Sequence, residues 1–86
     1  MDTLSDERLE REFKATKKAL DGIKIIINND DKNYEAALEF LDTAQRYYND
    51  ALYFREKNDR ASAFGALNYA FGWIDAGKKV GFFTEK

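Results

Sequence analysis

Apolar residues recur along most of the chain at helical spacing, and two polar clusters divide this pattern into three segments. The clusters are Asn-Asn-Asp-Asp-Lys-Asn at residues 28–33 and Lys-Asn-Asp at residues 57–59. Apolar side chains that alternate steps of four and three residues lie on one stripe of an α-helix. The pattern therefore predicts three helices, over about residues 5–28, 32–57 and 59–80.

The first helix has Thr3 or Ser5 as its predicted N-cap, because a hydroxyl there can accept a hydrogen bond from the first turn. The β-branched run at residues 23–27 is also typical of a strand. A strand needs a partner, and the sequence offers no evident second strand, so we expect the helix to continue through this run. The apolar stripe of this helix comprises Leu9, Phe13, Thr16, Leu20, Ile23 and Ile27.

The second and third helices are predicted in the same way. Asp59 is placed to cap the start of the third helix, and Gly81 suits the left-handed position just past its end. Phe82 is then placed to fold back as the apolar contact of that cap. The stripe of the second helix comprises Tyr34, Ala37, Leu38, Leu41, Ala44, Tyr48, Ala51 and Leu52. The stripe of the third comprises Phe64, Leu67, Phe71 and Ile74, with Ala63, Ala70 and Gly77 beside it.

Short connections between long helices make neighbouring helices antiparallel, so the expected fold is an all-α, up-down-up three-helix bundle. Its length favours a single domain spanning residues 1–86. The second and third helices resemble the hairpin of a tetratricopeptide repeat in their small-residue spacing. Asp50 and Asp75 depart from that repeat, which prefers leucine and proline there. The small residues, spaced seven apart on both sides of the turn, are Ala44, Ala51, Ala63 and Ala70.

Composition narrows the chemistry that this bundle can perform. The chain has no Cys and no His, which removes thiolate nucleophiles, imidazole bases and the usual zinc sites. Its net charge of −2 gives no general attraction to nucleic acid or to anionic lipid. No secretory signal or membrane-spanning run is present in the sequence. We therefore expect a cytoplasmic protein that is not an enzyme and that uses no metal or cofactor.

The third helix is too apolar to be covered by two neighbouring helices. Seven Phe, five Tyr and one Trp occur in the chain, and Tyr69 and Trp73 lie on the flank of this helix. One interpretation is that these two rings close the edge of the core, since isolated exposed aromatic residues are common. The other is an interaction surface for a protein, with a second copy of the chain as one candidate. That predicted surface comprises Tyr69, Gly72, Trp73 and Val80.

A competing hypothesis is a site for a small molecule or nucleotide between the second and third helices. Aromatic walls with a few convergent polar groups are typical of such pockets. Asp75 is one of these groups, and it can act as an acid or base, although an ion pair with Lys78 or Lys79 is the favoured interpretation. The predicted pocket comprises Tyr48, Asp50, Tyr53, Asn68 and Asp75.

Two charged faces allow further interpretations. Glu35, Glu39 and Asp42 share one helix face, as carboxylate metal ligands do in bundles, but a solvated acidic face is favoured because no His accompanies them. Lys and Arg residues of the first helix can track a phosphate backbone. They alternate with acidic residues at pairing distance, so nucleic-acid binding is the least favoured hypothesis.

The carboxyl half contains the string Tyr-Ala-Phe-Gly-Trp-Ile-Asp-Ala-Gly at residues 69–77, after Tyr-Asn-Asp-Ala-Leu-Tyr-Phe at residues 48–54. With this string the chain resembles, over roughly residues 10–83, the small, mainly archaeal helical family catalogued as domain of unknown function 357. The resemblance implies a helical bundle from a prokaryotic cytoplasm. It implies no activity and no catalytic residues.

Overall fold

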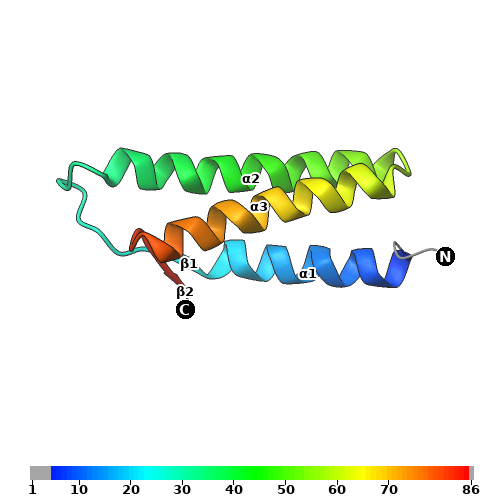
Figure 1. Ribbon diagram of the computed structural model, residues 1–86, viewed down its shortest axis with the longest axis horizontal. Helices are drawn as coiled ribbons and strands as arrows, with labels where there is room; N and C mark the ends of the chain where they lie inside the picture. The colour runs from blue at the N-terminus through cyan, green and yellow to red at the C-terminus, as the bar shows by residue number, and fades with distance from the viewer. Residues whose placement is uncertain (1–4, 86) are drawn as a thin grey trace.

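The computed structural model describes residues 5–85 and shows a rod of 49 × 20 × 18 Å (Figure 1). Consecutive helices run in opposite directions along the rod, with the third between the other two in this view. The all-α bundle predicted from the sequence is confirmed, with one short two-stranded sheet added at one end. The helices are α1 (Asp6–Gly22), α2 (Tyr34–Glu56) and α3 (Arg60–Lys79), and the strands are β1 (Ile23–Ile25) and β2 (Phe83–Glu85).

Helices α1 and α3 begin at side-chain caps. The Ser5 hydroxyl accepts a hydrogen bond of 3.2 Å from the Arg8 N–H, while Thr3, the other predicted cap, lies outside the described residues. The Asp59 carboxylate accepts one of 3.1 Å from the Ser62 N–H. Each cap satisfies a donor that the helix itself leaves unpaired, which fixes where the helix starts.

Helix α3 ends in the predicted glycine cap. Gly81 has a φ of +84°, its N–H donates to the Lys78 carbonyl at 3.2 Å, and the Phe82 N–H donates to the Gly77 carbonyl at 2.8 Å. These two bonds are the pair that defines a Schellman motif. The ring of Phe82 lies 5.1 Å from that of Phe40 on α2, so the residue after the cap turns back onto the bundle.

The predicted continuation of the first helix to residue 28 is wrong. Helix α1 ends at Gly22, and the next three residues form β1, paired antiparallel with β2. The strand has a partner because α1 and α3 run parallel, so their carboxyl ends meet at one end of the rod (Figure 1), and the turn at Gly81 redirects the chain beside β1. The paired residues are Ile23 with Glu85, Lys24 with Thr84 and Ile25 with Phe83.

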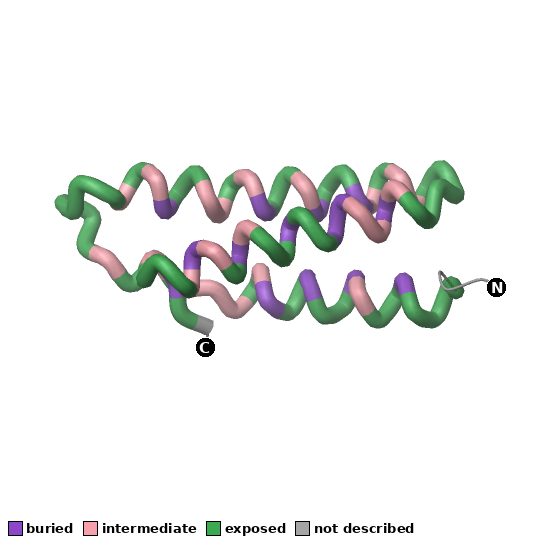
Figure 2. Tube along the Cα trace, in the orientation of Figure 1, coloured by how far each residue is buried: buried purple, intermediate pink, exposed green. Residues whose placement is uncertain are grey.

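Small residues set the separation of α2 and α3. Ala44, Ala51, Ala63 and Ala70 are all fully buried, as their spacing predicted. Figure 2 shows buried positions recurring along the inner side of each helix. Alanine leaves little side chain between two backbones, so the helices approach closely over this stretch. The likeness of this hairpin to a tetratricopeptide repeat stays a prediction.

The predicted apolar stripes are wrong at Phe71 and Leu38, which are exposed. On α3 the core instead takes Ala66, which the prediction omitted, beside Leu67 and Ala70. The reason is orientation: the alanine line of α3 must face α2, and at about 100° per residue Phe71 then points roughly a quarter turn away from Ala70. Its large side chain is left at the surface, where 42% of it is exposed.

Candidate interaction surface on helix α3

Tyr69 and Trp73 lie on the flank of α3 that borders α2, and we call these two residues the aromatic flank. Tyr69 is 64% exposed, and its ring stacks on Tyr47 of α2 with centroids 5.2 Å apart and planes at 23°. Trp73 is half-buried, and its ring meets Phe40 of α2 edge-on at 4.9 Å. Each α3 ring is therefore held by a ring of α2, which restricts its orientation while leaving part of it accessible.

Tyr47 and Phe40 support the flank, and the sequence interpretation did not include them. They lie seven residues apart on α2, so they share one side of that helix. This seven-residue spacing is the sequence signal by which Phe40 and Tyr47 could have been predicted to act together. It became meaningful only once the antiparallel hairpin placed Tyr47 beside Tyr69 and Phe40 beside Trp73.

Gly72 and Gly65 lie on the outward side of α3. Among residues 5–85, no atom of a packed neighbour comes within 4 Å of where a Cβ on either glycine would stand. Neither glycine is in a left-handed conformation, since Gly81 is the only described glycine with positive φ. A glycine inside a helix costs about 1 kcal/mol relative to alanine. Nothing within the described chain offsets that cost at these two positions.

Val80 is the C-cap residue of α3 and is also exposed. It follows Trp73 by seven residues, so its position continues the aromatic flank toward the end of the helix. The structure thus places all four residues of the predicted surface along α3. Val80 and Tyr69 are exposed, Gly72 is open to solvent, and Trp73 is half-buried.

Shallow hollows lie on both sides of Gly72. One, of about 270 Å³, is lined by Asn68, Tyr69, Gly72, Trp73 and Ala76. The other is lined by Asn68, Gly72, Phe71 and Asp75 of α3 together with Glu12 of α1. Both are open rather than enclosed. The missing side chain at Gly72 therefore leaves a furrow along α3 that large side chains border on each side.

Asp75 pairs with Lys79 one helical turn later, with Nζ and Oδ2 3.2 Å apart. This pair agrees with the favoured interpretation of an ion pair rather than an acid or base. More than half of the Asp75 side chain is exposed, and so is most of Lys79. Two exposed charges at this distance form an ordinary surface pair that contributes little to stability.

The residues of the predicted small-molecule pocket are dispersed. Tyr48 is buried, with its ring 5.8 Å from that of Phe13 on α1, so it belongs to the core. Tyr53 is exposed on α2 and contacts Phe54, and Asp50 is exposed on the same helix. The two α3 residues of the set, Asn68 and Asp75, share a hollow, and it lies on the outer side of α3, away from the predicted position between α2 and α3.

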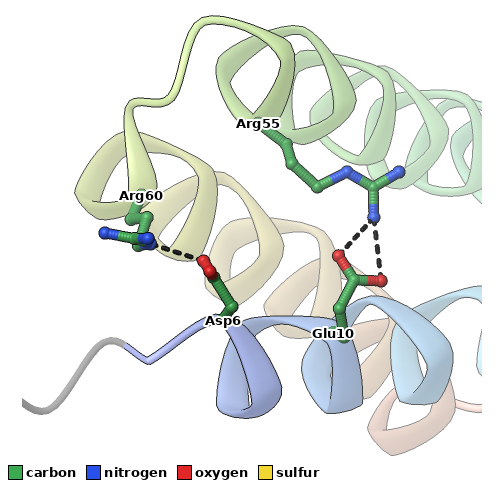
Figure 3. Close-up of polar contacts among 4 residues, drawn as sticks. All are labelled: Asp6, Glu10, Arg55 and Arg60. Atoms are coloured by element: carbon green, nitrogen blue, oxygen red, sulfur yellow. Dashed lines mark hydrogen bonds and ion pairs between the residues drawn. The ribbon is translucent and has the colours of Figure 1, made fainter.

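The charged residues of α1 pair with the far end of the α2–α3 hairpin, which the sequence did not indicate. Arg55 Nη1 donates to both Glu10 carboxylate oxygens, at 2.9 and 3.1 Å, and Arg60 Nε donates to Asp6 Oδ1 at 2.7 Å (Figure 3). The hydrogen bond from Arg60, and then its positive charge, hold the pKa of Asp6 below its ordinary value. Both pairs are largely exposed, so they specify where the start of α1 lies against the hairpin more than they stabilise the contact.

Three observations concern the remaining charged faces and the apolar character of the helices. In the part of the chain that the structure describes, no group of three or more acidic residues is arranged to hold a metal ion. Asp42 of the predicted acidic face pairs with Arg46, with Nε and Oδ2 2.7 Å apart. None of the helices within residues 5–85 combines the length and the apolar character needed to cross a membrane.

One comparison with known proteins gives a match. The family model described as "Protein of unknown function (DUF357)" matches residues 11–83. A search of curated proteins finds no match to this chain. The matched region includes all of α2 and α3 and both strands except the last two residues of β2.

Proposed function

Because the chain belongs to the DUF357 family, whose description assigns no activity, we propose its function from its surface: it is a non-catalytic protein-interaction module that uses the aromatic flank of α3. The observation that carries this proposal is the exposed, uncharged outer side of that helix. Residues 61–74 contain no charged side chain, although 35% of the chain is charged. Tyr69 and Phe71 are nonetheless exposed within this stretch.

The outer sides of the other two helices differ from that of α3. On α1 the exposed residues include Glu7, Arg11 and Lys14, and on α2 they include Glu35 and Asp42. Charged side chains keep such faces hydrated and discourage association. Interface cores are depleted of charge and enriched in Tyr, Trp and Phe, which is the composition of the α3 face. The contrast within one small protein supports α3 as the side that a partner covers.

The absence of Cys supports a cytoplasmic location for this module, since nothing in the chain depends on oxidising conditions. The partner class that fits the surface is protein. Nucleic acid would need a basic face, whereas residues 61–74 offer no charge and the basic residues Arg55 and Arg60 already pair with α1.

The test compares two tyrosines that are matched in exposure but lie on different faces. Tyr69→Glu introduces a charge on α3, and Tyr53→Glu introduces the same charge on α2, where Tyr53 is 56% exposed. Tagged versions of each protein are used to capture partners from the native lysate, and the self-association of each is measured. We expect Tyr69→Glu to lose partners or self-association and Tyr53→Glu to keep both. The proposal fails if the two folded variants behave alike.

A further inference from the structure

The outer face of α3 restricts what can cover it. Buried charges need an opposite charge or hydrogen bonds from their partner, and this face supplies no charge between Ala61 and Gly72. The part of a partner that covers this stretch of α3 must therefore be uncharged itself. The chain itself carries one such surface. The face comprises Ala61, Gly65, Asn68, Tyr69, Phe71, Gly72 and Ala76.

We infer that the partner is a second copy of this chain, docked with the two α3 helices antiparallel so that Gly72 of each copy lies against Gly65 of the other. This inference rests on the proposed function and names its partner. A two-fold axis that passes between Asn68 and Tyr69 produces two equivalent contacts. Gly72 of the first copy meets Gly65 of the second, and Gly65 of the first copy meets Gly72 of the second. Two glycines that face each other allow close approach of the two backbones. This contact gives Gly65 and Gly72 a role that they do not have in the single chain.

Charge fixes the direction of the two helices. Near the carboxyl end of this face stand Asp75 and Lys79, which pair with each other. A parallel arrangement would place Asp75 beside Asp75 and Lys79 beside Lys79, and like charges in contact are unfavourable. The antiparallel arrangement places Asp75 opposite Ser62 and Lys79 opposite Asn58, which are both uncharged. The intramolecular ion pair is then left intact in each copy.

The shape of the face agrees with this pairing. Tyr69 of one copy lies beside Asn68 of the other, at the edge of the 270 Å³ hollow next to Gly72. The ring of Tyr69 is already held against Tyr47, so little side-chain entropy is lost when it is covered. In this arrangement Tyr69 of each copy lies at the edge of the furrow that Gly72 leaves in the other copy.

The surface area of the chain leaves room for such an interface. Its accessible surface is 5964 Å², whereas a folded monomer of 10.0 kDa is expected to expose about 5,200 Å². The chain thus exposes about 700 Å² more than that expectation. A stable interface of standard size removes about 800 Å² from each partner, which is close to this excess.

The first experiment measures mass against concentration by analytical ultracentrifugation, for the complete chain at micromolar to millimolar concentration. We expect a monomer–dimer equilibrium that Gly72→Leu abolishes. Thermal unfolding verifies that this variant is folded, which we expect because the side chain points into open space. Ala15→Leu is the matched control: it adds the same side chain to an exposed position of α1 and leaves the dimer unchanged.

The second experiment tests the direction, using the absence of native Cys. Asn68→Cys lies next to the axis and forms a disulfide with itself across the dimer. Lys79→Cys does not, because antiparallel docking separates the two thiols by about 30 Å along the helices. A mixture of Ala61→Cys and Ala76→Cys forms the mixed disulfide, since these positions face each other. Rapid self-crosslinking of Lys79→Cys would overturn the antiparallel arrangement.

The outcomes of these experiments distinguish a failure of the dimer from a failure of the proposed protein-interaction function. A chain that stays monomeric over the whole concentration range, or a dimer that survives Gly72→Leu, overturns the second copy as the partner on this face. If Tyr69→Glu still loses a captured protein in that case, the interaction function stands with a different partner. If Tyr69→Glu changes nothing, both fail.

Discussion

Replacing Thr16 with valine is expected to stabilise the protein. Thr16 lies on the inner side of α1, only 1% exposed, and its Oγ1 has no hydrogen-bond partner within residues 5–85. A buried hydroxyl that loses water without gaining a partner costs about 1–3 kcal/mol. Valine has nearly the same shape and a similar helix propensity, so it removes the cost without opening a cavity. We expect the free energy of unfolding to rise by about 1–2 kcal/mol.

The measurement is urea and thermal unfolding, followed by circular dichroism and by the fluorescence of Trp73, the single tryptophan. For a chain of this size a gain of 1–2 kcal/mol raises the unfolding temperature by roughly 5–10 °C. Thr16→Ser is the informative companion: it keeps the hydroxyl and removes a buried methyl, so it should lower the stability by about 1 kcal/mol. Thr43→Val is the control at a half-buried helical threonine, with an expected change of about 0.5 kcal/mol or less.

Two outcomes would contradict an unpaired Thr16 hydroxyl as the cause of the gain. If Thr16→Val is no more stable than the parent protein while Thr43→Val behaves as expected, the hydroxyl has a partner in solution. The carbonyl one turn earlier in α1 or a buried water would be that partner. A gain shared equally by both variants would also contradict this cause, because the effect would then not depend on burial.

Three further predictions concern glycines and pH. Gly77→Ala should lower stability by about 1–3 kcal/mol and disturb β2, because a Cβ there would overlap the Phe83 ring; denaturation of the variant checks this. Gly65→Ala should raise stability by up to about 1 kcal/mol in dilute solution, since its Cβ enters open space, and a loss would contradict that. Hydrogen bonds hold the pKa values of Asp6 and Asp59 below the ordinary value of 3.8, so they bind protons more weakly folded than unfolded. Their contribution to stability is complete above about pH 5 and is lost as the pH falls through their folded pKa values; Asp6→Asn should flatten the acid side of the unfolding profile.

Local signals in the sequence were sufficient to predict the three helices, the starts of the first and third, and the end of the third, but not the end of the first at Gly22. The caps at Ser5 and Asp59 and the glycine stop at Gly81 depend on bonds between residues a few positions apart, so each is written in a short stretch of sequence. The buried alanines of the hairpin were predictable for a similar reason, since helical periodicity alone assigns them to one side. The family resemblance is likewise confirmed by a match over residues 11–83.

The residues proposed for the candidate site could be chosen from the sequence, because helical periodicity places Tyr69, Gly72 and Trp73 on neighbouring stripes of α3. Which of these stripes faces solvent could not be predicted in the same way. The supporting rings of Tyr47 and Phe40, and the exposure of Phe71, depend on how α2 is rotated against α3. Rotation follows from packing of the whole interface, and no local stretch encodes it.

Short-range signals predict three helices, the caps of the first and third, the close-packed hairpin and an uncharged stretch on the third helix. The strand at residues 23–25 depends on the assembled bundle, because its partner strand lies about sixty residues away and meets it only when α1 and α3 end side by side. The same holds for the ion pairs of Asp6 with Arg60 and of Glu10 with Arg55, which are 54 and 45 residues apart. Helices form from contacts between near neighbours, whereas strand pairing and interhelical ion pairs need the whole bundle to bring distant residues together.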